Sequence, residues 1–95
     1  MRITECEKNA IIDAVKNADP AARVWLFGSR ADDNKKGGDI DIGILSERID
    51  LMKEIEIKQM IWDKIGEQKI DIALSKDGQE AFFKHIVIKG LLLYG

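Results

Sequence analysis

Residues 39–45 read Asp39-Ile40-Asp41-Ile42-Gly43-Ile44-Leu45, and the rest of the fold can be built outward from this stretch. Isoleucine occupies every second position, and successive side chains of a β-strand point to opposite faces. We therefore predict a strand over 39–45 with Ile40, Ile42 and Ile44 on a buried face. Asp39 and Asp41 share the opposite face, which we interpret as a functional or hydrated one.

Two further apolar runs predict strands that accompany this one. Residues 23–27 form a short apolar run that ends at Gly28, which indicates a buried strand. Residues 69–74 alternate as the central strand does and place Asp71 between two isoleucines. The intervening segment 31–38 is polar and ends in two glycines, so it predicts a flexible connection.

Helices are predicted between the strands by apolar spacing and by end signals. Thr4 and Glu7 have the spacing of a capping box, and Asp19-Pro20 ends the helix they open, because proline disfavours a helical conformation in the residue before it. Residues 50–65 indicate a second helix that stops at Gly66. Its predicted buried stripe consists of Leu51, Ile55, Trp62 and Ile65.

The end of the chain predicts one more helix and an apolar tail. Asp77 and Glu80 have the spacing of a second capping box, and the helix that follows would run to Gly90. The segment 91–94 is apolar, so we expect it to dock on another part of the protein.

Composition excludes several classes of protein. The chain has 95 residues, of which 34% are charged, and a net charge of -2. This predicts one domain over 1–95, without a membrane span or a signal peptide. Basic residues are scattered, so we expect no general nucleic-acid binding. Cys6 is the single cysteine, which excludes an internal disulfide and favours a reducing, cytoplasmic location.

The turn after the first strand has the residues of a phosphate-binding loop. Gly28 allows the backbone to approach a ligand closely, and Ser29 adds a hydroxyl group. Successive backbone N–H groups in such a turn can form a nest for an anion. Arg30 follows with a guanidinium group whose planar shape suits phosphate. We therefore predict Gly28, Ser29 and Arg30 as nucleotide-binding residues.

Three aspartates predict a metal site beside this turn. Asp39 and Asp41 are two residues apart on a strand, so their carboxylates point the same way. Neighbouring carboxylates repel one another unless a cation neutralises them, and Mg²⁺ prefers oxygen ligands supplied by carboxylates and phosphates. Asp71 joins them if its strand lies alongside. We therefore predict two Mg²⁺ ions held by Asp39, Asp41 and Asp71 with bound nucleotide.

A shared site constrains the directions of the strands. Gly28 follows the end of the first strand, whereas Asp39 and Asp41 begin the second, so these two strands should run antiparallel. Asp71 begins the third strand, which should therefore run parallel to the second after a helical crossover. The fold class predicted is α/β (α+β), with a small mixed sheet of about three to four strands flanked by helices.

These residues resemble a known family. Gly28-Ser29-Arg30, Gly38-Asp39-Ile40-Asp41-Ile42 and Ile70-Asp71-Ile72 resemble the minimal nucleotidyltransferases of the DNA polymerase beta-like superfamily. The resemblance covers nearly the whole chain, including the ending 88–94. Gly38 departs from the family pattern, which often has serine at this position. The departure removes a possible hydroxyl contact but no metal ligand.

The resemblance implies a palm-like fold and nucleotidyl transfer from ATP or another nucleoside triphosphate. It implies that Gly28, Ser29 and Arg30 hold the β- and γ-phosphates and that Asp39 and Asp41 carry both metals. Asp71 would complete one metal site and help to activate an acceptor hydroxyl. Such proteins often pair with a small helical HEPN protein as antitoxin and toxin, and the acceptor is then a tyrosine of the toxin.

Each feature also has a simpler interpretation. Gly28-Ser29 alone could be an ordinary turn, Arg30 a solvated loop charge, and Asp39, Asp41 and Asp71 the polar side of a sheet. The alternative function is a non-catalytic, nucleotide-binding module that neutralises a helical partner by contact. The apolar tail 91–94 could contribute to that interface or to a homodimer.

Overall fold

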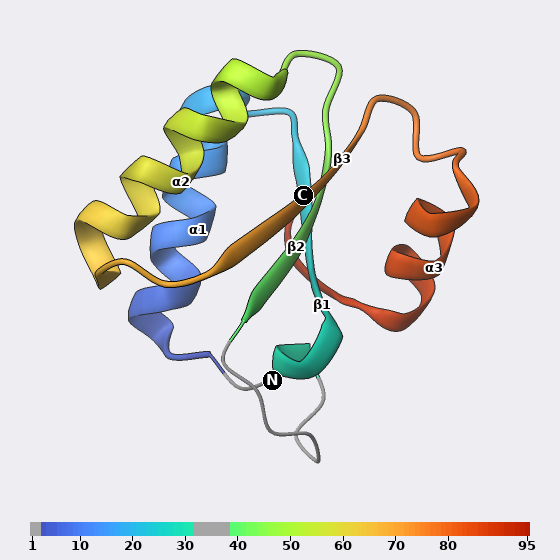
Figure 1. Ribbon diagram of the computed structural model, residues 1–95. Coiled ribbons are helices and arrows are strands. Elements are labelled where there is room, and N and C mark those ends of the chain that lie inside the picture. The colour runs from blue at the N-terminus through green and yellow to red at the C-terminus, as the bar shows by residue number, and fades with distance from the viewer. Residues whose placement is uncertain (1–2, 32–38) are drawn as a thin grey trace.

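The computed structural model describes residues 3–31 and 39–95 (Figure 1). The connection predicted over 31–38 therefore lies outside the described residues, apart from its first position. In chain order the elements are α1 (Glu5–Ala18), β1 (Arg23–Phe27), the 3-10 helix η1 (Gly28–Ala31), β2 (Ile40–Leu45), α2 (Leu51–Ile65), β3 (Ile70–Ser75), α3 (Ala81–Lys89) and β4 (Leu91–Tyr94).

The strands form one mixed sheet in the order β3-β2-β1-β4. Strands β1 and β2 pair antiparallel, β2 and β3 pair parallel, and β4 adds antiparallel to the free side of β1. The predicted strand directions and fold class are confirmed. The apolar tail 91–94 docks as predicted, because it supplies an edge strand to the sheet.

Helices cover both faces of this sheet (Figure 1). Helices α1 and α2 lie side by side on one face, where Ile40, Ile42 and Ile44 are fully buried against them. Helix α3 covers the other face through a second cluster formed by Trp25, Phe83 and Ile86. Alternate residues of β1, β2 and β3 therefore belong to different cores, and the predicted face of isoleucines is confirmed.

The ends of the first two helices are formed by the predicted signals. The Glu7 backbone N–H donates to Thr4 Oγ1 at 3.0 Å, and the Thr4 backbone N–H donates to Glu7 Oε1 at 2.8 Å, which completes the capping box. Helix α2 ends at Gly66, whose φ of 88° is a conformation that glycine adopts without strain.

The predicted stripe of α2 is correct in its second half, where Trp62 and Ile65 are partly buried against the core, and wrong in its first half. Ile57 and Ile61 face the core, whereas Leu51 and Ile55 are 69% and 57% exposed. A helix turns by about 100° per residue, so Ile55 lies nearly opposite Ile57. Apolar residues occur around most of this helix, and its packing against α1 selects which of them are buried.

The second predicted capping box is also wrong. Glu80 is the N-cap of α3 but makes no capping hydrogen bond with its side chain. Its Oε1 instead accepts a hydrogen bond from Ser75 Oγ at 2.6 Å, and Asp77 Oδ1 accepts from the Gln79 N–H at 3.0 Å. The Glu80 carboxylate is therefore bonded to the buried Ser75 hydroxyl instead of to the backbone N–H groups at the start of α3.

A membrane-spanning helix is not found among the described residues, since each helix there is too short or too polar for that role.

Candidate active site

The register of the parallel pair brings two of the predicted aspartates together. Asp41 of β2 is the direct partner of Asp71 of β3, and Ile40 is the partner of Ile70. Partners in a sheet point to the same face, so both carboxylates lie on the side of the sheet that faces α3. Asp39 immediately precedes β2, and the following Ile40 N–H donates to the Lys69 carbonyl at 3.0 Å.

Gly28 is brought to the same place by the antiparallel pair. Phe27, the last residue of β1, is the register partner of Asp41, and Gly28 begins η1 directly after it. The φ of Gly28 is 75°, and a β-carbon on this residue would overlap Asp41 Oδ2. A side chain is therefore excluded here both by backbone conformation and by the carboxylate.

The polar face is shorter than the alternation in the sequence suggests. Gly43 lies on the same side as Asp41 but is buried under α3, where an added β-carbon would lie 2.8 Å from Ile86 Cγ2. Leu45 packs at the edge of the same cluster. The face predicted to be functional is thus covered by α3 over its second half, and the site is confined to the beginning of β2 and β3.

Burial and the crowding of the carboxylates perturb the ionisation of Asp41. Burial raises the pKa of Asp41 above its usual range, and the charge of Asp71 and a hydrogen bond with Asp71 raise it further. Asp39 contributes in the same direction, whereas Lys69 lowers the pKa. The site therefore carries a concentration of negative charge that a bound cation would relieve.

Asp39 makes a different contact from the other two aspartates. Its Oδ2 lies 3.4 Å from Lys69 Nζ, and both side chains are largely exposed. Within residues 3–31 and 39–95, no three carboxylate, imidazole or thiolate groups are already placed to hold one ion together. Asp41 and Asp71 are adjacent, and the assignment of all three aspartates as metal ligands stays a prediction.

Arg30 is directed toward helix α1. Its guanidinium Nη1 lies 3.8 Å from Glu7 Oε2, and only 15% of its side chain is exposed. Glu7 also accepts from the Thr4 N–H and from Gln68 Nε2, so it ties the start of α1 to the segment before β3. Arg30 and Gly28 share η1, while the Ser29 side chain lies outside the part that the structure describes.

Sequence reasoning did not single out Lys69 or Glu7 for the site. A signal for Lys69 was present, because it stands two residues before Asp71 and such residues point to one face of an extended chain. Glu7 gave no comparable signal, since its contact with Arg30 joins residues far apart in sequence.

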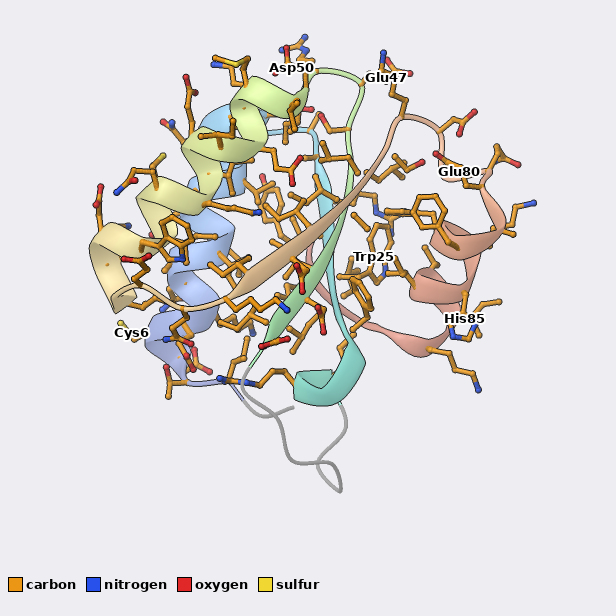
Figure 2. All side chains as sticks on the ribbon, in the orientation of Figure 1. Cys6, Trp25, Glu47, Asp50, Glu80 and His85 are labelled. Atoms are coloured by element: carbon orange, nitrogen blue, oxygen red, sulfur yellow. The ribbon has the colours of Figure 1, made fainter. Side chains whose placement is uncertain are left out.

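A cavity of about 440 Å³ has none of the three site aspartates in its lining. Its lining includes Ser46, Asp50, Ser75 and Glu80, at the carboxyl ends of β2 and β3. Figure 2 shows Asp50 and Glu80 at the end of the sheet opposite η1. The Ser46 and Ser75 hydroxyls are hydrogen-bonded within the protein, to Asp19 and Glu80 respectively. The cavity is therefore separate from the candidate site formed around Asp41 and Asp71.

Comparison with known proteins agrees with this geometry. No significant match is found among curated proteins. The model of the family described as "Polymerase beta, Nucleotidyltransferase" matches residues 9–95, a range that includes Gly28, the three aspartates and the four strands. Since this range spans most of the chain and the sheet has the mixed topology expected, the chain belongs to the polymerase beta nucleotidyltransferase family.

Proposed function

We propose that this protein is a metal-dependent nucleotidyltransferase that transfers AMP from ATP to a hydroxyl group and releases pyrophosphate. The observation that carries the proposal is the meeting of Gly28, Asp41 and Asp71 at one end of the sheet. A turn that excludes a side chain lies directly against a pair of crowded carboxylates. This combines a place for phosphates with a place for cations.

Backbone groups of η1 and the Arg30 side chain would hold the β- and γ-phosphates, with Ser29 contributing its hydroxyl. Asp39, Asp41 and Asp71 would hold Mg²⁺, two ions in the presence of nucleotide, and their oxygen atoms are the donors that this cation prefers. Bound Mg²⁺ would neutralise the carboxylates and the triphosphate and polarise the α-phosphate. The raised pKa of Asp41 supports this fit, because burial and then the charge of Asp71 disfavour the ionised carboxylate, and a bound cation would favour it.

Asp71 is the exposed member of the pair, so it is the carboxylate that an acceptor would approach. The acceptor hydroxyl oxygen would form a bond to the α-phosphorus while the bond from that phosphorus to the bridging oxygen breaks. Pyrophosphate leaves, and the hydroxyl proton passes to Asp71 and then to solvent. Holding the two reactants in line would provide much of the acceleration.

We propose a tyrosine of a small helical HEPN protein as the acceptor. Asp71 is exposed, so its carboxylate is accessible to a side chain that another protein presents. Exposed apolar side chains on α2, α3 and β4 could provide contacts for such a partner or for a second copy of the chain. We place the reaction in the cytoplasm, in line with the free Cys6.

The experiment is intact-mass analysis of the HEPN protein after incubation with this protein, ATP and Mg²⁺. A gain of one or more AMP units is expected with the native chain and none with Asp41→Asn. Asp63→Asn is the matched control, because Asp63 lies on α2 and contacts Gln59 instead of the site. An equal gain with Asp41→Asn would overturn the assignment.

A non-catalytic nucleotide-binding antitoxin is the second candidate. The observation that favours it is the pairing of Asp39 with Lys69, which occupies one of the carboxylates proposed as metal ligands. In that case Mg²⁺ and ATP would raise the melting temperature while the partner gains no mass. The first candidate requires both effects, so the two measurements together discriminate between them.

A further inference from the structure

Lys69 and Asp39 form an ion pair at the entrance of the candidate site. The two residues immediately precede β3 and β2, which are paired in parallel from Ile70 and Ile40 onward. The backbone hydrogen bond from Ile40 to the Lys69 carbonyl fixes this register at its first step. The two side chains therefore start from neighbouring positions, and their charged atoms meet at 3.4 Å.

We propose that Lys69 is the resident counter-cation of Asp39, and that a divalent metal must displace its ammonium group to bind Asp39. This inference rests on the proposed function, since it assumes that Asp39 is a metal ligand. In the metal-free protein Lys69 then limits repulsion among the aspartates. When a metal arrives, the same residue competes with it.

The geometry of the pair suits displacement. The side chains of Lys69 and Asp39 are 69% and 47% exposed, so water can replace either partner when the pair opens. An ammonium group on a flexible four-carbon stem can move without a change in the backbone. The Lys69 carbonyl meanwhile keeps its hydrogen bond to Ile40, so the strands stay in register while the charge leaves.

Lys69 acts on Asp41 only through its charge, which lowers the pKa of that carboxyl group. The carboxylates of Asp41 and Asp71 meet each other across the parallel pair, and among the described residues the ion pair of Lys69 is with Asp39. Lys69 should therefore affect metal binding mainly through Asp39, and most of its influence should be lost when Asp39 loses its charge. A general effect of positive charge near the site would persist in that background.

The test is a titration of the full chain with Mn²⁺ in the absence of nucleotide, with free Mn²⁺ measured by electron paramagnetic resonance. Lys69→Met should tighten the dissociation constant by about two- to fivefold, the range expected from an exposed ion pair. Lys76→Met is the matched control, because Lys76 follows the opposite end of β3, about 20 Å away along the strand. At physiological ionic strength this distance exceeds the screening length, so the control should bind as the native chain does.

A double-mutant cycle separates direct competition from a general charge effect. Asp39→Asn should weaken Mn²⁺ binding, and Lys69→Met added to it should change the dissociation constant by less than 1.5-fold. Lys69→Arg, which keeps the charge, should stay close to the native value. An equal gain from Lys69→Met in both backgrounds would overturn the role assigned to the ion pair.

The outcomes also separate this inference from the proposed function. If the native chain binds Mn²⁺ and Lys69→Met binds it with the same affinity, the inference is wrong and the metal site stands. If neither protein binds Mn²⁺ with or without ATP, the proposed function is wrong and the inference is overturned with it. Circular dichroism and melting temperatures of all variants show whether the compared proteins are equally folded.

Discussion

Gly28 lies so close to Asp41 that a β-carbon on the glycine would overlap Asp41 Oδ2. The pairing of Phe27 with Asp41 across β1 and β2 holds the two residues in this position. The backbone of η1 therefore forms one wall of the space around the carboxylate. This relationship links the predicted phosphate turn to the predicted metal ligands, and it makes the glycine a sensitive position for substitution.

Gly28→Ala should reduce nucleotide transfer by at least about 100-fold, because the added methyl group displaces the Asp41 carboxylate. The positive φ adds a cost in stability of about 1–2 kcal/mol, which corresponds to a fall of roughly 4–16 °C in melting temperature. Labelled-nucleotide transfer well below the melting temperature, together with calorimetry, measures the two effects separately.

Gly66→Ala provides the control for backbone strain. Gly66 has a φ of 88°, close to that of Gly28, but a β-carbon there would meet no atom within 4 Å. Because the ψ of Gly66 is 162°, a combination found almost only for glycine, this variant should lose at least as much stability and keep native transfer. Loss of transfer in both variants would show that strain alone accounts for the Gly28 effect.

Asp71→Asn should separate stability from activity. Removal of one charge from the Asp41–Asp71 pair relieves repulsion in the metal-free protein, so we expect a rise of about 2–4 °C in melting temperature at neutral pH, or roughly 0.5 kcal/mol. Transfer should fall by at least about 100-fold. A lower melting temperature than that of the native chain, measured in the presence of a chelator, would contradict the repulsion.

The response to ligand should change in the same variant. For the native chain, Mg²⁺ and ATP at about 100 times the dissociation constant should add roughly 2.7 kcal/mol, or about 10 °C or more in melting temperature. Asp71→Asn should lose most of this shift, and the chelator should abolish it in the native chain. A full shift in the variant would exclude Asp71 as a ligand.

Stability in acid should depend on Asp19, which is distant in sequence from the three aspartates of the candidate site. Asp19 is buried and accepts a hydrogen bond from Ser46 Oγ at 2.6 Å. This bond is the main cause that lowers the pKa of Asp19 below 3.8, with the Ala21 N–H and the Arg48 charge assisting and burial opposing. The stabilising contribution is therefore complete above the unfolded pKa and is lost as the pH falls through the lower, folded pKa.

In Asp19→Asn, the free energy of unfolding should consequently fall less steeply with decreasing pH below about pH 4. At neutral pH the substitution should cost about 1–3 kcal/mol, the range for hydrogen bonds to buried charged groups. Ser46→Ala should reproduce part of this change in slope, and the double variant should add little. Urea titrations from pH 2 to 7 measure this, and an unchanged acid slope in Asp19→Asn would contradict the assignment.

Helix α3 should depend on the absence of a side chain at Gly43. A β-carbon there would lie 2.8 Å from Ile86 Cγ2, so Gly43→Ala should destabilise the fold by about 1–3 kcal/mol. Ile86→Ala removes the colliding atom, and the double variant should lose less than the sum of the single losses. Additive losses would show that α3 adjusts without this contact.

Local sequence was sufficient for most of the individual elements. Alternating isoleucines predicted β2 and β3, and the Thr4–Glu7 box, Pro20 and Gly66 predicted the helix ends, because these signals act within one or two turns of the backbone. The need for Gly28, Asp41 and Asp71 to meet then predicted the strand directions. Local signals failed in the first half of α2 and at Glu80, where packing against α1 and the Ser75 hydroxyl determine which residues are buried or hydrogen-bonded.

The sequence by itself therefore determined the element types, the family resemblance and the identity of the candidate site residues. The tertiary structure decided how far the polar face extends, since α3 covers Gly43 and leaves Asp41 at the sheet's end. It also decided that Arg30 meets Glu7 and that Lys69 meets Asp39. Such contacts depend on the register of the strands and the docking of the helices. Both are set by interactions between residues far apart in sequence, which local sequence patterns do not specify.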